Sequence, residues 1–203
     1  MRLGWLQFIG FCFLLMLFHA SIAAAAEGTP SIPSTQPALP ATRPSVGDMA
    51  NDFKLNTLDH KTVELADLRQ NGPVVLVVLR GWVGYQCPIC NRQVGDLIAH
   101  GHELTATGAS VVLVYPGPAD NLESHAEDFI AGKTLPEHFY FVVDPMMAFV
   151  SDYGLRWNAA RENAYPATFV IGADGKIVFE KISRTHGDRA KATQILAVLP
   201  TAK

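Results

Sequence analysis

The chain has 203 residues, a formal net charge of −3 and 49% hydrophobic residues. This length allows one domain of ordinary size with extensions, and the hydrophobic content is enough for a sizeable core. Acidic and basic residues are mixed along the chain without a basic run or an acidic tail, which gives no reason to expect nucleic acid as a partner.

Residues 1–26 have the layout of a secretory signal peptide. Arg2 supplies a positive start, Leu3–Leu17 is almost wholly apolar, and Ser21–Ala26 offers small residues for a cut after Ala26. The alternative is an uncleaved membrane anchor, because the apolar stretch is close to the ~20 residues of a spanning helix. We favour cleavage, since polar residues weaken the span. The mature protein is then expected outside the cytoplasm, periplasmic or extracellular, and tethered to the membrane only if the segment is retained.

Residues 27–45 are rich in Pro, Ser, Thr and Ala and have no apolar periodicity. They are interpreted as a semi-extended linker, with plain terminal disorder as the alternative. The folded domain is expected over residues 46–203.

The predicted elements of this domain alternate between buried strands and helices. Continuous apolar runs predict strands buried on both faces, and an Asp-Gly turn at 173–176 predicts a closing β-hairpin. In chain order we expect strands at 53–55, 62–65 and 73–79, a helix at 88–106, a strand at 110–115, a helix at 119–131, a strand at 139–143, a helix at 145–153, strands at 166–171 and 176–182, and a helix at 188–199. This order predicts an α/β fold, with a mixed central sheet, helices on both faces and an N-terminal β-hairpin extension.

A Cys-x-x-Cys pair follows the first long buried strand. Pro88 suits the first position of a helix, which makes Cys87 its N-cap residue. Free backbone N–H groups and the helix dipole then favour the thiolate of Cys87, which is the nucleophilic form. Cys90 lies nearly one turn later, on the same face and more buried, in a position to attack a mixed disulfide or sulfenic acid at Cys87. A redox-active Cys87–Cys90 disulfide is the expected working group, with no further cofactor and no metal.

Other interpretations of the pair remain open. Half of a zinc site would need His100 or His102, which point to different sides of a helix. A structural disulfide suits an oxidising compartment. A copper chaperone would use Cys87 and Cys90 with His186, although His186 also reads as a solvated loop residue.

Several motifs, in order, resemble the AhpC/TSA (redoxin, peroxiredoxin-like) branch of the thioredoxin-like superfamily. They are Val46–Phe53, Val63–Leu68, Val74–Leu79, Arg80-Gly81, Cys87–Cys90, Arg92-Gln93 and Tyr165–Ile177. The resemblance implies a thioredoxin-like fold and a thiol-dependent oxidoreductase or peroxiredoxin-like antioxidant enzyme.

The resemblance also assigns roles to individual residues. It makes Cys87 the attacking cysteine and Cys90 its partner, and it implies that Pro166 follows a cis peptide bond facing them. Tyr165 would then offer its backbone C=O or N–H to an extended thiol substrate. Apart from the resemblance, Trp82 and Tyr85 either form a lip for a partner protein or pack the loop against the domain, and Arg80 is a candidate substrate contact. Asp144 is expected to end a strand, and at that strand end it is also considered as a proton acceptor.

The chain departs from the peroxiredoxin motif P-x-x-x-[TS]-x-x-C. Arg80 stands in place of the Pro, Gly84 in place of the Thr or Ser, and Tyr165 in place of the Arg before the Pro-Ala-Thr-Phe segment. Thiol–disulfide exchange needs fewer groups than peroxide cleavage. We therefore expect a protein or small-molecule thiol or disulfide as partner, with peroxide reduction weaker and peroxiredoxin chemistry proper as the alternative.

Overall fold

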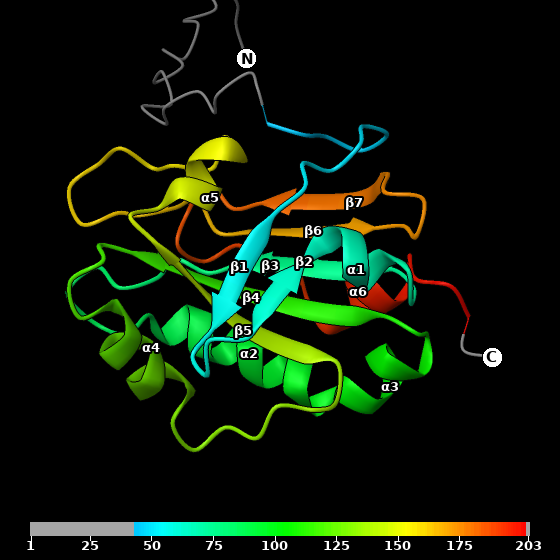
Figure 1. The fold of residues 1–203 in the computed structure, drawn as a ribbon, viewed down its shortest axis with the longest axis horizontal. Coiled ribbons are helices and arrows are strands. Elements are labelled where there is room, and N and C mark those ends of the chain that lie inside the picture. Colours follow the sequence, from blue (N-terminus) through cyan, green and yellow to red (C-terminus); the bar gives the residue numbers. More distant parts are fainter. Residues whose placement is uncertain (1–42, 202–203) are drawn as a thin grey trace, which may run out of the picture. The chain divides into compact units, whose positions relative to one another are not determined.

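A computed structural model describes residues 43–201 of the chain (Figure 1). These residues form seven strands and six helices. The strands are β1 (Lys54–Thr57), β2 (Thr62–Glu64), β3 (Val74–Val78), β4 (Ser110–Gly117), β5 (Phe139–Pro145), β6 (Ala167–Ile171) and β7 (Ile177–Ile182); the helices are α1 (Leu65–Arg69), α2 (Pro88–Ala99), α3 (Gly101–Ala106), α4 (Leu122–Ile130), α5 (Ala148–Asp152) and α6 (Ala192–Leu196).

The strands form one mixed sheet in the order β2-β1-β5-β4-β3-β6-β7. The three central strands β5, β4 and β3 run parallel, whereas β6 and β7 are antiparallel additions at one side. The β1–β2 hairpin joins the other side through β5. This arrangement confirms the predicted α/β sheet and its N-terminal hairpin extension.

Helices cover both faces of the sheet, as Figure 1 shows. Alternate side chains of β3 separate into two cores: Val75 and Val77 face α2, α4 and α6, whereas Val74, Leu76 and Val78 face α1 and α5. Every residue of β3 and β4 is buried. The continuous apolar runs in the sequence therefore mark strands covered on both sides.

The helices differ from the sequence expectation in number or in bounds. Helices α4 and α5 each start three residues after the predicted 119 and 145, because Asn121 and Met147 before them have left-handed backbone, with φ 58° and 61°. The predicted helix over 88–106 is two helices, because His100 leaves helical geometry with φ −98° and ψ 15°. Helix α6 starts at Ala192 rather than 188, where its N–H donates to Asp96 Oδ2 at 2.8 Å. Helix α1 was not predicted, since its five residues are too few to show a helical period.

The expected signal peptide at residues 1–26 and most of the linker lie outside the described residues. Within residues 43–201, no helix is long and apolar enough to cross a membrane. The description starts at Arg43, three residues before the expected domain start, and Pro44 is already buried. Gly47 N–H donates to Ile177 O at 2.9 Å, which attaches this start of the domain to β7.

The loop that follows β3 places the cysteine pair at the end of the sheet where the parallel strands have their carboxyl ends. Val78 pairs with Ala167, so Pro166 enters β6 at the same edge. Gly81 is required in this loop: it has φ 73°, and a Cβ there would lie 1.7 Å from Pro116 O. The close passage against the end of β4 fixes the direction in which the chain approaches Cys87.

Candidate active site at the Cys87–Cys90 pair

Cys87 is the N-cap residue of α2, as the sequence predicts. Its backbone is extended, with φ −70° and ψ 111°, and Pro88 occupies the first turn. The Cys90 N–H donates to Cys87 Sγ at 3.3 Å. Both cysteines are free thiols in this structure, and both are buried, with 4% of Cys87 and 1% of Cys90 exposed. Cys87 is therefore the slightly more accessible of the two residues.

The two thiols differ in acidity. The hydrogen bond from the Cys90 thiol lowers the pKa of Cys87 to about 5, and it is helped by the backbone N–H groups of Cys90 and Ile89 and by the charge of Arg189, against the opposing effect of burial. The same hydrogen bond and deeper burial raise the pKa of Cys90. Because the thiolate is the nucleophilic form of cysteine, Cys87 is the more nucleophilic of the two thiols near neutral pH.

Arg80 holds this site through both its backbone and its side chain. Its N–H donates to Cys90 Sγ at 3.5 Å. Its guanidinium donates to both carboxylate oxygens of Glu162, to the Arg161 carbonyl and to the Tyr85 hydroxyl. Burial alone would lower the pKa of Arg80, but the hydrogen bonds to Glu162 and Tyr85 outweigh it and raise the pKa. The side chain proposed to contact substrate is thus engaged with protein groups.

Glu162 connects Arg80 to an aromatic cluster. Its Oε1 lies 2.8 Å from His186 Nε2, and the His186 ring is 5.4 Å from the ring of Trp157. Trp157 in turn stacks on Tyr165 with centroids 4.6 Å apart. His186 therefore contacts Glu162, not the cysteines. Within residues 43–201, no group of three or more His, Cys, Asp or Glu residues has the arrangement of a metal site.

The prediction of a cis bond before Pro166 is wrong, because residues 43–201 contain no cis peptide bond. Pro166 follows a trans bond, the isomer that X–Pro bonds generally favour, and its carbonyl accepts the Ser183 N–H at 2.8 Å. The Tyr165 N–H is also not free for substrate, since it donates to Leu155 O at 2.8 Å. Pro166 does lie at the expected place, at the edge that carries the cysteine loop.

The two aromatic residues before Cys87 have different surroundings. Trp82 stacks on His125 of α4 with ring centroids 3.7 Å apart, and its carbonyl accepts from Asn163 Nδ2. Gln86 reinforces the same attachment by donating to His125 O at 2.7 Å. Tyr85 is 48% exposed above Arg80. The loop is thus packed by Trp82, while Tyr85 presents its ring to solvent.

Sequence reasoning did not identify two further residues of this site. Arg189 Nη2 lies 3.9 Å from Cys90 Sγ. Gln93 is buried on α2 and donates to Thr168 Oγ1 at 3.3 Å and to Ala190 O at 3.4 Å. The Arg92-Gln93 motif pointed to Gln93, but nothing in the sequence places Arg189 beside Cys90, which lies 99 positions away.

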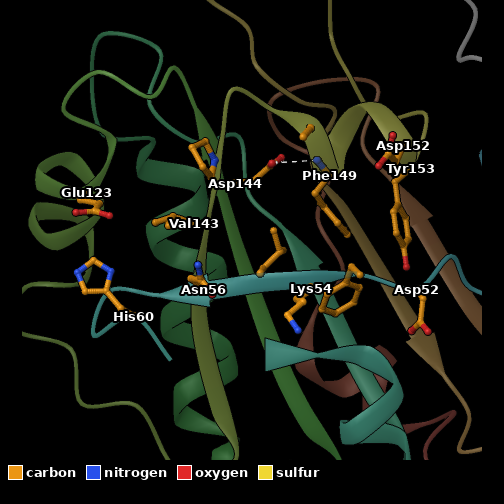
Figure 2. Close-up of a pocket in the computed structure, with 14 residues that line it drawn as sticks. Asp52, Lys54, Asn56, His60, Glu123, Val143, Asp144, Phe149, Asp152 and Tyr153 are labelled. Atoms are coloured by element: carbon orange, nitrogen blue, oxygen red, sulfur yellow. Dashed lines mark hydrogen bonds between the residues drawn. The ribbon is translucent and has the colours of Figure 1, made fainter. Parts of the chain in front are cut away.

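A separate pocket of about 440 Å³ lies beside β1, the end of β5 and α5 (Figure 2). Cys87 and Cys90 are not among its lining residues. Asp144, which was considered as a proton acceptor, is buried here and accepts the N–H groups of Phe149 at 3.0 Å and Val150 at 3.1 Å. Burial raises the pKa of Asp144 against the effect of these bonds. Its contacts are those of a cap that holds the start of α5.

Comparisons with known proteins agree with this architecture. Residues 46–180 match the AhpC/TSA family. The fold is similar to peroxidoxin BcpB from Mycobacterium tuberculosis, with TM-score 0.60, 21% identity, and coverage of 77% of this chain and 96% of that one. It is also similar to a cysteine-to-serine variant of peroxiredoxin 6 of Arenicola marina, with TM-score 0.59, 15% identity, and coverage of 75% and 70%. No curated protein matches the chain.

Proposed function

This chain belongs to the AhpC/TSA family, and we propose that it is a thiol–disulfide oxidoreductase in which Cys87 and Cys90 cycle between dithiol and disulfide. The observation that carries this proposal is the asymmetry of the pair. Cys87 is the thiol of lowered pKa at a helix N-terminus, and Cys90 is a protonated, more deeply buried neighbour that donates to it.

With a disulfide R–S–S–R as the oxidant, the proposed reaction has two steps. The Cys87 thiolate attacks one sulfur, forming Cys87–S–S–R and releasing RS⁻. Cys90 then loses its proton and attacks Cys87 Sγ, which forms the Cys87–Cys90 disulfide and releases the second RS⁻. Two electrons pass from the protein dithiol to the substrate, which leaves as two thiols once protonated. A dithiol reductant reverses the two steps on the protein and restores the pair.

We further propose an exported location and a thiol or disulfide partner, either a protein or a small molecule. The signal-peptide layout of residues 1–26 supports export. Outside the cytoplasm, disulfides persist, so both the substrate and the oxidised protein pair would be long-lived there. The exposed Tyr85 beside the Cys87 loop supports contact with a partner.

Peroxide reduction is the second candidate, favoured by the family to which the chain belongs. The same thiolate would attack a peroxide oxygen and become a sulfenic acid, with release of water or an alcohol. Cys90 would then condense with the sulfenic acid, releasing water and forming the same Cys87–Cys90 disulfide. The two candidate reactions therefore use the same two cysteines and end in the same disulfide. They differ in the oxidant that Cys87 attacks.

Trapping of the first intermediate tests the proposal. Cys90→Ser is expected to accumulate a mixed disulfide when treated with a small disulfide, because no second thiol can resolve it. Cys87→Ser is expected to form no adduct at a comparable rate, and the wild type should pass to the internal disulfide. Intact-protein mass spectrometry distinguishes the three species. Adduct formation in Cys87→Ser but not in Cys90→Ser would reverse the roles and refute the assignment.

A further inference from the structure

A groove of about 400 Å³ lies near Cys90, since Arg189, one of its lining residues, is 3.9 Å from Cys90 Sγ. One wall is α2, through Ile89, Arg92, Gln93 and Asp96. The other wall is the segment that leads into α6, through Gly187, Arg189, Ala190 and Lys191. This volume falls in the range of small-molecule sites.

The groove is positively charged in a protein whose formal charge is negative. Three cations line it, namely Arg92, Arg189 and Lys191, against the single carboxylate of Asp96. The Asp96 carboxylate is already occupied, because it accepts the Ala192 N–H at 2.8 Å and lies 3.5 Å from His100 Nδ1. Among residues 43–201, no ion pair joins any of the three cations to a carboxylate. Their charge is therefore not neutralised by the fold.

Arg189 connects the groove to the reacting atoms. It lines the groove, its Nη2 lies 3.9 Å from Cys90 Sγ, and its charge helps to lower the pKa of Cys87. Ile89, which lies between the two cysteines in the sequence, contributes to the same groove. Cys87 and Cys90 do not line the groove themselves, and Arg189 is the residue that joins a ligand there to Cys90 Sγ.

The buried polar atoms of the groove are not all satisfied by protein groups. Gln93 is 5% exposed, and its Oε1 has no hydrogen-bond partner; Arg189 Nε is likewise buried without one. Unpaired buried polar atoms are costly in a folded protein and call for an explanation. Arg189 Nε is a donor and matches a carboxylate ligand, whereas Gln93 Oε1 is an acceptor and does not contribute to this argument.

We propose that this groove binds the carboxylate of a small disulfide substrate and so selects anionic over neutral or cationic disulfides. The inference rests on the proposed function, since the substrate sulfur is attacked by Cys87 as described above. Arg92 and Lys191 attract and hold the carboxylate, whereas Arg189 lies between it and the sulfur atoms. The substrate class is therefore a carboxylate-bearing disulfide small enough for a cavity of about 400 Å³.

The test compares three symmetrical disulfides of different charge: 3,3′-dithiodipropionate, bis(2-hydroxyethyl) disulfide and cystamine. The reduced full chain, freed of reductant, is mixed with each, quenched with an alkylating reagent and analysed by mass spectrometry for the internal disulfide. The quantity of interest is the rate constant for the anionic compound divided by that for the neutral one, which is then compared between variants. Comparing the anionic-to-neutral ratio of a variant with that of the wild type cancels the intrinsic reactivity of each compound.

The variant is Arg92→Gln/Lys191→Gln, and the matched control is Lys61→Gln/Lys176→Gln, which changes the net charge equally. Lys176 is exposed in the β6–β7 turn, at the end of the sheet opposite the cysteines, and Lys61 is exposed in the β1–β2 turn. We expect the anionic-to-neutral ratio to fall about fivefold in the groove variant, because two exposed charges that attract the carboxylate are removed. The ratio should be unchanged in the control, and the cationic disulfide should gain in the groove variant.

Two results would overturn the inference while leaving the proposed function intact. One is an equal ratio in wild type and groove variant, and the other is an equal fall in the groove variant and the control. Either result is informative only if the disulfides react through Cys87. If wild type and Cys87→Ser react alike with all three compounds, the proposed function fails and the groove assignment fails with it.

Discussion

Arg80 and Glu162 form a buried two-point ion pair, with Nε–Oε2 and Nη2–Oε1 distances of 2.7 Å. The pair joins the second residue after β3 to the segment that precedes β6, and the same Arg80 donates its backbone N–H to Cys90 Sγ. Both side chains are more than nine-tenths buried. The ion pair therefore fixes the loop that presents the cysteines, rather than taking part in the chemistry of a sulfur atom.

The first prediction concerns this ion pair. Removing one partner leaves a buried, uncompensated charge, so Glu162→Ala and Arg80→Ala should each lower the free energy of unfolding by about 3–5 kcal/mol. The double variant Arg80→Met/Glu162→Leu should lose much less, because no unpaired charge remains. Urea denaturation of the reduced proteins measures these values. Additive losses in the double variant would show that the two side chains act independently.

The second prediction is a pH profile for the first reaction. The pKa of Cys87 is lowered to about 5. Since the thiolate reacts, the alkylation rate should rise as pH increases through this range and should be level near pH 7, where a free thiol of pKa about 8.5 is still mostly protonated. The leading cause is the hydrogen bond from the Cys90 thiol, so removing that donor should raise the midpoint.

Two variants isolate that hydrogen bond. Cys90→Ser keeps a donor at the same place, whereas Cys90→Ala removes it, and both leave Cys87 as the single thiol in residues 43–201. We expect the midpoint to be higher in Cys90→Ala than in Cys90→Ser. Iodoacetamide rates from pH 4 to 10 test this. Midpoints of 8.5 or above in both variants would contradict the argument from the helix terminus as well as that from Cys90.

The sequence predicted the local part of the site and missed the long-range part. The N-cap position of Cys87 depends on its neighbour Pro88, and the buried strands depend on continuous apolar runs, so both can be read from adjacent residues. The contacts of Arg80 with Glu162 and of Cys90 with Arg189 join residues 82 and 99 positions apart. Only the folded sheet brings these residues together, and the hydrophobic pattern of the sequence does not predict such long-range contacts.

The trans bond before Pro166 illustrates the limit of reasoning from resemblance. The motif around Pro166 placed the residue at the correct sheet edge, next to the cysteine loop. It did not determine the isomer of the Tyr165–Pro166 bond, which is trans. The family resemblance therefore predicted where Pro166 lies in the fold, but it did not predict the backbone conformation of the bond before it.

The third prediction concerns Asp144 (Figure 2). Its carboxylate caps α5 through two backbone N–H groups in a buried site. Asp144→Ala should therefore lower the free energy of unfolding by about 1–3 kcal/mol, because two buried donors lose their partner. Exposed Asp152, on the same helix, is the matched control, and Asp152→Ala should cost less than about 0.5 kcal/mol.

The same Asp144 variant separates a cap from a proton acceptor. If the carboxylate only holds α5, the rate constant for reduction of a neutral disulfide by the folded Asp144→Ala protein should stay within about twofold of wild type, since general acid–base catalysis typically contributes 10²–10⁴-fold. A loss of that size in protein that is still folded by circular dichroism would assign Asp144 to the chemistry.

The last prediction is that hydrogen peroxide is reduced with little acceleration. Attack on peroxide places negative charge on the departing oxygen, and one prearranged donor for such charge is typically worth about 10²–10³ in rate. The usual hydroxyl position is Gly84, whose φ of 99° also disfavours a residue with a side chain there. Tyr165 is buried in its stack with Trp157, and the Arg80 guanidinium is engaged with Glu162, Tyr85 and the Arg161 carbonyl. We therefore expect Cys87 of Cys90→Ser to react with hydrogen peroxide within about tenfold of a small thiol at equal thiolate fraction, as measured by sulfenic acid formation. An acceleration of 10² or more would mean that a donor exists, and substitution of Arg80, Arg156, Arg161 and Arg189 in turn would locate it.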